Sequence, residues 1–233
     1  AASSMSSTCK IPIIADCDTG YGGPSNVRHM VQKYENAGIS SICIEDKTFP
    51  KQNSLLENGK NDLLSEKEFV AKILAAKEAR NDKNFIIIAR VEALISGAGM
   101  NEALKRAVAY ENAGADAILI HSKQKTPDEI FEFTDSWKGS APIVVVPTTY
   151  DSVKISELEA HKIKMVIYAN QTLRVAHMAM SRLLKEMINA DHISDVKDKM
   201  STMQDIFSLQ EMYDIKNKEK KLEEELKKLG YIN

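Results

Sequence analysis

The chain lacks both a long apolar run and an excess of positive charge. Its 233 residues contain 31 Lys and Arg against 33 Asp and Glu, a formal net charge of −2. A nucleic-acid-binding domain usually carries a strongly basic face, so this balance excludes no fold but argues against DNA or RNA as the partner. No apolar stretch approaches the ~20 residues that a membrane helix needs. The first residues also lack the basic and apolar segments of a secretory signal.

Cysteines and dinucleotide-binding glycines are also scarce. The three cysteines, Cys9, Cys17 and Cys43, are odd in number and have no metal-binding spacing. They are therefore expected to be free thiols in the reducing cytoplasm. No Gly-x-Gly-x-x-Gly follows the first apolar run, as a dinucleotide-binding fold requires, so no such cofactor is expected.

What the chain does have is a regular alternation of short apolar runs and longer amphipathic segments. Consecutive Ile and Val residues are typical of parallel strands that are covered on both faces. The expected strands are residues 11–15, 39–44, 85–91, 117–120, 143–146 and 165–169. The expected helices between and after them include residues 27–36, 66–80, 101–112, 127–137 and 172–189. Gly38 and Gly114 follow two of these helices, where a glycine ends the last turn.

Six strand–helix units predict a parallel α/β fold, with a closed barrel favoured over an open sheet. A (β/α)8 barrel of the TIM type needs eight units, so two are missing at the front, or the fold is not a full barrel. We expect residues 1–200 to form this partial barrel, containing strands 3 to 8. Residues 201–233 are expected to be a helical extension and not an independent domain, with a solvated Lys/Glu face.

Acidic residues close the first two expected strands. Residues 16–22 read DCDTGYG, and Glu45 ends the second strand. Because side chains alternate along a strand, Asp16 and Asp18 are expected on the same side, beside Glu45. Mg²⁺ prefers a few carboxylates together with waters and substrate oxygens. The pattern predicts a Mg²⁺ site made of Asp16, Asp18 and Glu45, although loop-capping and surface carboxylates are the alternative.

Two further polar residues end the next strands. Arg90 stands in an otherwise apolar strand, and a buried guanidinium needs a carboxylate or a substrate anion as its partner. A simple ion pair with Glu92, which shares its side, is one reading of Arg90. His121 ends the following strand and is either a structural histidine or a functional group at the barrel rim.

The loop of residues 47–64 is long and polar for a connection between a strand and a helix. Loops of this kind are often lids over an active site. Lys51 and Asn53 would bring hydrogen-bond donors to an anionic substrate when the lid closes, with Gly59 as a flexible point. A variable surface loop without function is the alternative.

At these residues the chain resembles the phosphoenolpyruvate mutase family of the isocitrate lyase superfamily. The most specific match is the loop signature Glu-Asp-Lys-x-x-x-Lys-x-Asn-Ser, which includes Lys51, Asn53 and Ser54. The strand ends at residues 16–22, 89–93 and 116–123 match as well. The loop has no Cys-Gly-His, which the lyases of the superfamily carry, and this argues against C–C bond cleavage by that route.

The resemblance implies an isomerase that shifts a phosphoryl group between the enol oxygen of phosphoenolpyruvate and C3 of pyruvate, giving phosphonopyruvate for phosphonate biosynthesis. Asp16 would bind Mg²⁺ directly, and Asp18 and Glu45 through water. Arg90 and His121 would anchor the anionic ends of this small substrate. The lid residues Lys51, Asn53 and Ser54 complete the expected catalytic set, orienting the phosphoryl group and excluding water.

The resemblance also implies that two strand–helix units precede Ala1, with a backbone anion seat and a further Asp. Without them we expect impaired activity. It implies a homo-oligomer, dimer or tetramer, that exchanges a C-terminal helix, with residues 172–189 and 204–213 as candidates. A phosphonopyruvate hydrolase of the same family, and a non-catalytic barrel remnant that only associates with other subunits, are the alternatives.

Overall fold

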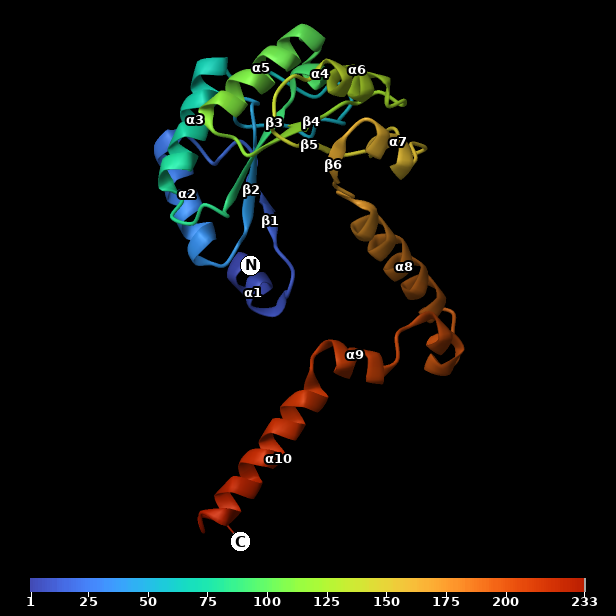
Figure 1. Cartoon of the computed structure of the whole chain (residues 1–233). Helices are drawn as coiled ribbons and strands as arrows, with labels where there is room; N and C mark the ends of the chain where they lie inside the picture. Colours follow the sequence, from blue (N-terminus) through green and yellow to red (C-terminus); the bar gives the residue numbers. More distant parts are fainter. Residues whose placement is uncertain (233) are drawn as a thin grey trace. The chain divides into compact units, whose positions relative to one another are not determined.

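A computed structural model describes residues 1–232 of the chain. Six parallel strands form one sheet in sequential order, and the sheet curls as Figure 1 shows. The strands are β1 (Ile14–Asp16), β2 (Ser41–Glu45), β3 (Ile86–Val91), β4 (Ala117–Ile120), β5 (Ile143–Val145) and β6 (Ile163–Val166). A parallel sheet without any reversal of strand order is the arrangement that a barrel uses. The predicted parallel α/β fold is confirmed as a curled, six-stranded half barrel.

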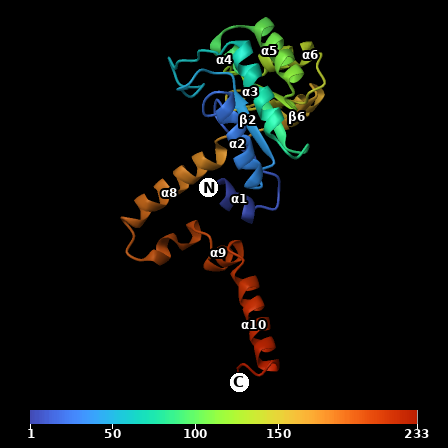
Figure 2. The same ribbon diagram turned by 90° about the vertical axis from the view of Figure 1, so that its left-hand side faces the viewer.

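Helices connect successive strands and lie on one face of the sheet, as Figure 2 shows for α2, α3 and α5. The helices of this part are α1 (Ala2–Thr8), α2 (Pro24–Asn36), α3 (Glu66–Ala79), α4 (Ala93–Ser96), α5 (Met100–Ala113), α6 (Asp128–Ser136) and α7 (Ile155–Ala160). Both predicted helix-ending glycines are confirmed, because Gly38 has φ +79° and Gly114 has φ +105° just after α2 and α5. Ser65 and Glu68 form a capping box that begins α3.

The first and last strands differ from the predicted ranges. Pairing with β2 begins only at Ile14, opposite Ser41, so residues 11–13 are not strand. The last strand begins at Ile163, two residues earlier than predicted. Lys164 interrupts its apolar pattern and is exposed, which hides the strand from an argument based on consecutive apolar residues.

Alternation along the strands separates two apolar clusters. Residues such as Ile42, Ile87 and Ile118 pack in the large cluster that includes residues of α2, α3, α5 and α6. The opposite, inner face of the sheet holds a smaller cluster, made of Cys43, Ile88, Ala117, Leu119, Val144 and Val146. The inner-face positions continue at the carboxyl ends of the strands, and there the side chains become polar.

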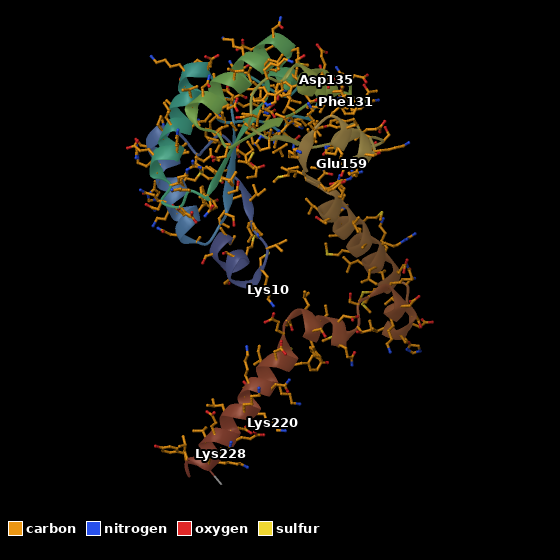
Figure 3. All side chains as sticks on the ribbon, in the orientation of Figure 1. Lys10, Phe131, Asp135, Glu159, Lys220 and Lys228 are labelled. Carbon is orange, nitrogen blue, oxygen red and sulfur yellow. The ribbon has the colours of Figure 1, made fainter. Side chains whose placement is uncertain are left out.

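Surface contacts join α6 to the end of α7. Phe131 and Asp135, labelled in Figure 3, are one helical turn apart on α6. The ring of His161, just after α7, stacks on Phe131 with centroids 3.8 Å apart. Its Nδ1 lies 2.9 Å from Asp135 Oδ1.

Contacts divide the chain into two compact units, residues 1–169 and residues 170–233. The second unit contains α8 (Gln171–Met187), a 3-10 helix (Ile193–Lys199), α9 (Met203–Leu209) and α10 (Met212–Lys228). In the region where a helical extension is predicted lie α9 and α10, and α10 carries exposed lysines such as Lys220 and Lys228 (Figure 3). Within residues 1–232, no helix has the length and apolar character that crossing a membrane requires.

Candidate active site

Polar side chains gather at the carboxyl ends of β2, β3 and β4. Glu45 ends β2 and pairs in register with Arg90 of β3, and His121 directly follows β4. Glu45, Arg90 and His121 share the inner face with Cys43, Ile88 and Leu119, because side chains two residues apart point the same way. The carboxyl end of the strands is where barrel enzymes place their active sites. The predicted grouping of these three residues is therefore present.

Alternation of side chains along a strand does not explain how Asp16 and Asp18 come to lie at this end of the sheet. β1 ends at Asp16, and Asp18 has φ +58°, outside strand geometry. The backbone N–H of Asp18 donates to Asp16 Oδ1 at 3.0 Å. The Asp18 carbonyl in turn accepts from the backbone N–H of Glu45 at 2.8 Å. A local turn, and not the period of the strand, thus places Asp18 beside the end of β2.

The ammonium group of Lys51 pairs with the carboxylates of both Asp18 and Glu45. Lys51 Nζ lies 3.3 Å from Asp18 Oδ1 and 3.3 Å from Glu45 Oε1. Asp18 Oδ1 and both oxygens of Glu45 are buried without a hydrogen-bond partner. Asp16 is exposed, and among residues 1–232 no three His, Cys, Asp or Glu side chains already converge in metal-binding geometry. Oxygen atoms of this kind fit a hard cation that keeps several of its waters.

Charges at the site shift one another's proton affinity. Burial raises the pKa of Glu45, although Arg90 acts in the opposite direction. Burial would lower the pKa of Lys51, but the carboxylates of Glu45 and Asp18 raise it. A lysine in this position is therefore cationic, and its charge compensates the two acidic groups.

Arg90, Glu92 and His121 form one network. Arg90 Nε donates to Glu92 Oε1 at 2.6 Å, so the ion pair expected from their shared side is present, and Nε also lies 3.4 Å from Glu45 Oε2. Burial alone would raise the pKa of Glu92, but the hydrogen bond with His121 and the charge of Arg90 lower it to about 2. Burial lowers the pKa of His121, so its ring is neutral beside this carboxylate at neutral pH.

His121 Nδ1 lies between a hydrogen-bond acceptor and a hydrogen-bond donor. It lies 2.9 Å from Glu92 Oε1, which can only accept, and 2.8 Å from Arg90 Nη2, which can only donate. A single ring nitrogen satisfies one of these partners at a time. An anionic ligand atom that accepted the Arg90 Nη2 hydrogen would leave Nδ1–H free to donate to Glu92.

The loop of residues 47–64, the predicted lid, folds over the strand ends. Its two ends pair, with the Thr48 N–H donating to the Asp62 carbonyl and the Leu64 N–H to the Asp46 carbonyl. Ser54 is only 7% exposed, and its hydroxyl donates to Glu92 Oε2 at 2.6 Å. Lys51 and Ser54 thus contact charged groups at the strand ends.

Asn53 does not point into this network. Its side chain is exposed, and its Oδ1 accepts the backbone N–H of Leu55 at 2.9 Å. Gly59 lies in the lid, where its N–H donates to the Leu56 carbonyl.

Sequence reasoning missed the importance of Glu92 and Lys47. The period of the strand predicts Glu92 only as an ion-pair partner of Arg90, yet Glu92 also accepts a hydrogen bond from Ser54 and faces His121. The sequence marks Lys47 only as the start of the loop and as a member of its signature, yet Lys47 is 1% exposed and its ammonium binds three lid groups. Glu92 directly follows β3, between Val91 and Ala93, and Lys47 lies two residues after β2. A charged residue close to the end of a buried strand is the signal that could have identified them.

The comparisons with known proteins agree on one family. The phosphoenolpyruvate phosphomutase family model matches residues 1–188. A phosphoenolpyruvate phosphomutase of Tetrahymena pyriformis is 45% identical over 217 residues, which span 93% of this chain and 72% of the relative. A phosphonopyruvate hydrolase of Variovorax sp. (strain Pal2) is 47% identical over 207 residues, 88% of this chain and 71% of the relative.

Solved structures give the same result. A phosphoenolpyruvate phosphomutase from Streptomyces platensis subsp. rosaceus superposes with a TM-score of 0.91 at 44% identity, covering 94% of this chain and 76% of that chain. A phosphonopyruvate hydrolase in complex with oxalate and Mg²⁺ gives 0.86 at 44% identity, covering 93% and 74%. With the family model spanning most of its length and its site at the expected strand ends, this chain belongs to the phosphoenolpyruvate phosphomutase family.

Proposed function

We propose that this chain interconverts phosphoenolpyruvate and phosphonopyruvate by moving a phosphoryl group between the enol oxygen and C3 of the pyruvyl unit. The observation that carries the proposal is the closed lid, which brings Lys51 to Asp18 and Glu45 and buries Ser54 on Glu92. A closed site excludes water, and this exclusion separates transfer within the substrate from hydrolysis. The relatives named phosphoenolpyruvate phosphomutase support the same reaction.

Mg²⁺ is the proposed metal, with Asp16 as a direct ligand and Asp18 and Glu45 acting through water. Asp18 Oδ1 and both Glu45 oxygens are buried and accept no hydrogen bond from residues 1–232, and the cations Lys51 and Arg90 lie near them, which fits this assignment. When bound, the ion supplies positive charge next to the pyruvyl carboxylate and enolate oxygens. The Mg²⁺ in the solved structure of the related hydrolase supports a divalent metal in this family.

Arg90 and His121 are the proposed anchors for the anionic ends of the substrate. Arg90 keeps Nη2 directed at Ser54 and His121 while its Nε is held by Glu92. A substrate oxygen that accepts the Nη2 hydrogen leaves His121 Nδ1–H free to donate to Glu92. Lys51 of the lid is proposed to orient the migrating phosphoryl group together with Asn53, whose exposed side chain would turn away from the Leu55 N–H when substrate binds. Ser54 fixes the lid in place.

Phosphonopyruvate hydrolysis is the second candidate. A specific observation favours it, because the hydrolase relative from Variovorax is 47% identical, similar to the mutase relative from Tetrahymena. The two reactions share the substrate and the metal site, and they differ in whether water reaches the phosphoryl group. The Asn53-Ser54 pair of the lid is the reason to place the mutase first.

Phosphorus NMR on phosphonopyruvate with Mg²⁺ separates the candidates. We expect the phosphonopyruvate resonance to be replaced by that of phosphoenolpyruvate. Free phosphate together with pyruvate would establish a hydrolase instead. An unchanged spectrum would leave a non-catalytic barrel remnant as the function of this chain.

Replacing Asn53 with Ala should mainly damage the transfer step. Loss of one donor at a developing negative charge typically slows turnover by roughly 100-fold. Mg²⁺ binding should remain, because Asn53 is exposed and does not contact the acidic groups. Steady-state rates and a Mg²⁺ titration by calorimetry would measure the two effects. Asn58→Gly is the control, since Asn58 is an exposed lid asparagine whose φ of +57° glycine adopts readily.

The remaining parts of the proposal concern the rest of the molecule. A homo-oligomer, dimer or tetramer, with an exchanged helix is supported by α8, which has exposed apolar side chains and none buried in this chain. Two strand–helix units before β1 are supported by the half barrel, in which β1 has a single neighbour. Residues 201–233 are a helical extension, and three free cysteines fit the reducing cytoplasm.

A further inference from the structure

We propose that Lys47 and Glu92 form a buried latch that holds the lid closed and couples its closure to the orientation of Arg90 and His121. Both act as positioning residues. Only the purpose of lid closure, the exclusion of water from the reaction, rests on the proposed function. The latch itself is a property of the protein without substrate.

Lys47 binds the lid through every hydrogen of its ammonium group. Nζ donates to the Gln52 carbonyl at 2.7 Å, to Ser54 Oγ at 3.0 Å and to Asn61 Oδ1 at 3.1 Å. An ammonium has three donors and no acceptor, so three lid groups satisfy it completely. Lys47 is 1% exposed with the lid in this position, and lifting the tip of the lid would break these hydrogen bonds to a charged donor.

Glu92 accepts a hydrogen bond from the lid residue Ser54. Ser54 has one hydroxyl hydrogen, which it donates to Glu92 Oε2 while its oxygen accepts from Lys47. Lys47 Nζ lies 3.9 Å from the same Glu92 oxygen, so the two charges also attract each other directly. Hydrogen bonds to charged groups are stronger than those between neutral groups. Ser54 therefore joins a buried cation and a buried anion that both follow strand ends.

The second oxygen of Glu92 transmits the effect to the anion-binding residues. Oε1 accepts from Arg90 Nε at 2.6 Å and lies 2.9 Å from His121 Nδ1. One carboxylate thus contacts the lid on Oε2 and the two anchors on Oε1. When Ser54 leaves, Glu92 loses a partner and Arg90 Nη2 loses its 3.3 Å contact with Ser54 Oγ. Lid position and anchor geometry are coupled through this group.

Hydrogen–deuterium exchange of the free protein tests the latch without any reaction. Ser54→Ala removes the docking hydroxyl from the lid and leaves the strands untouched. Lys47→Met keeps an apolar stem and removes the three donors. We expect amide exchange in residues 51–62 to rise by about 10- to 100-fold in each variant, since bonds to charged groups are lost. Exchange in β3 and α3 should be unchanged, which global destabilisation would not permit.

Lys60→Met is the matched control for Lys47→Met. Lys60 lies in the same lid, but its side chain is 68% exposed and pairs with Asp62 at the surface. Its replacement should leave lid exchange unchanged. If Lys60→Met and Lys47→Met accelerate exchange equally, or if neither Ser54→Ala nor Lys47→Met accelerates it, the latch is refuted.

A double-mutant cycle tests the coupling through Glu92. Glu92→Gln keeps the shape of the side chain and removes its charge. Because Ser54 and Glu92 belong to one contact, the double variant with Ser54→Ala should exchange no faster than the faster single variant. Multiplied effects would contradict a shared contact. The two proposals can fail separately. If the original chain turns over substrate but the variants exchange at its rate, only the latch is refuted. If the variants exchange faster but the original chain shows no turnover, only the proposed function is refuted.

Discussion

Replacing Arg106 with Met should lower the free energy of unfolding by about 3–5 kcal/mol, the usual result of removing one partner from a buried ion pair. Arg106 Nη1 donates to Asp46 Oδ2 at 3.0 Å, and the Asp46 side chain is fully buried. The hydroxyl of Tyr110 donates to the same oxygen at 2.6 Å. Methionine retains the apolar stem of arginine, so the loss reports mainly the carboxylate left without its cation. Urea denaturation would measure it.

Arg28→Met provides the control for burial. Arg28 Nη2 lies 2.6 Å from Glu78 Oε2, closer than the Arg106–Asp46 contact, but the two side chains are 41% and 70% exposed. Exposed pairs contribute about 0–1 kcal/mol, so this variant should unfold at nearly the same urea concentration as the original protein. Equal destabilisation by the two substitutions would show that burial does not determine the strength of these pairs.

The Arg106 cluster also matters for the site, because it fixes both ends of the lid. Asp46 precedes the lid and its Oδ1 accepts the backbone N–H of Glu92 at 2.9 Å. Arg106 Nη1 also donates to the carbonyl of Leu64, at the other end of the lid, at 3.0 Å. α5 thus holds the base of the lid and the backbone of Glu92 through one buried group. A lid fixed at its base moves mainly through its tip, where the latch residue Ser54 lies.

Local patterns in the sequence predicted the features that depend on residues close together in the chain, such as strands and helix ends. Apolar runs marked the existence of all six strands but misplaced the ends of β1 and β6 by up to three residues. Gly38 and Gly114 marked two helix ends, because left-handed turns depend on only a few residues. The shared side of Arg90 and Glu92 followed from the same period. Asp18 was placed by the wrong reasoning, since its position comes from a turn with positive φ.

Contacts between distant segments could not be predicted in this way. Glu92 becomes central only when Ser54, 38 residues earlier, is folded against it. Lys47 becomes central only when residues 52–61 return over the strand ends. The exposed position of Asn53 likewise depends on the fold of the lid, and its sequence neighbours do not determine it. The lid signature indicated that these residues belong together, but not which of them hold the lid.

The second large effect is expected at Asp16, where Asp16→Asn should weaken Mg²⁺ binding by at least about 100-fold. Loss of a group that merely supports a metal ligand already costs 10- to 100-fold in affinity, so loss of a direct ligand should cost no less. Asparagine keeps an oxygen that can accept the Asp18 N–H, as Asp16 Oδ1 does at 3.0 Å, and it removes only the charge. Calorimetric titration with Mg²⁺ measures the change, and Mg²⁺-dependent turnover should disappear with it.

Asp62→Asn separates a specific ligand from a general effect of negative charge. Asp62 is 58% exposed and pairs with Lys60 on the lid, away from the carboxylates of Asp18 and Glu45. Its replacement changes the net charge by the same amount, so Mg²⁺ affinity should stay the same. Asp16→Ala extends the test, because it removes the turn acceptor as well. If Asp16→Asn binds Mg²⁺ normally while Asp16→Ala does not, Asp16 positions Asp18 through the turn, and the metal ligands are Asp18 and Glu45.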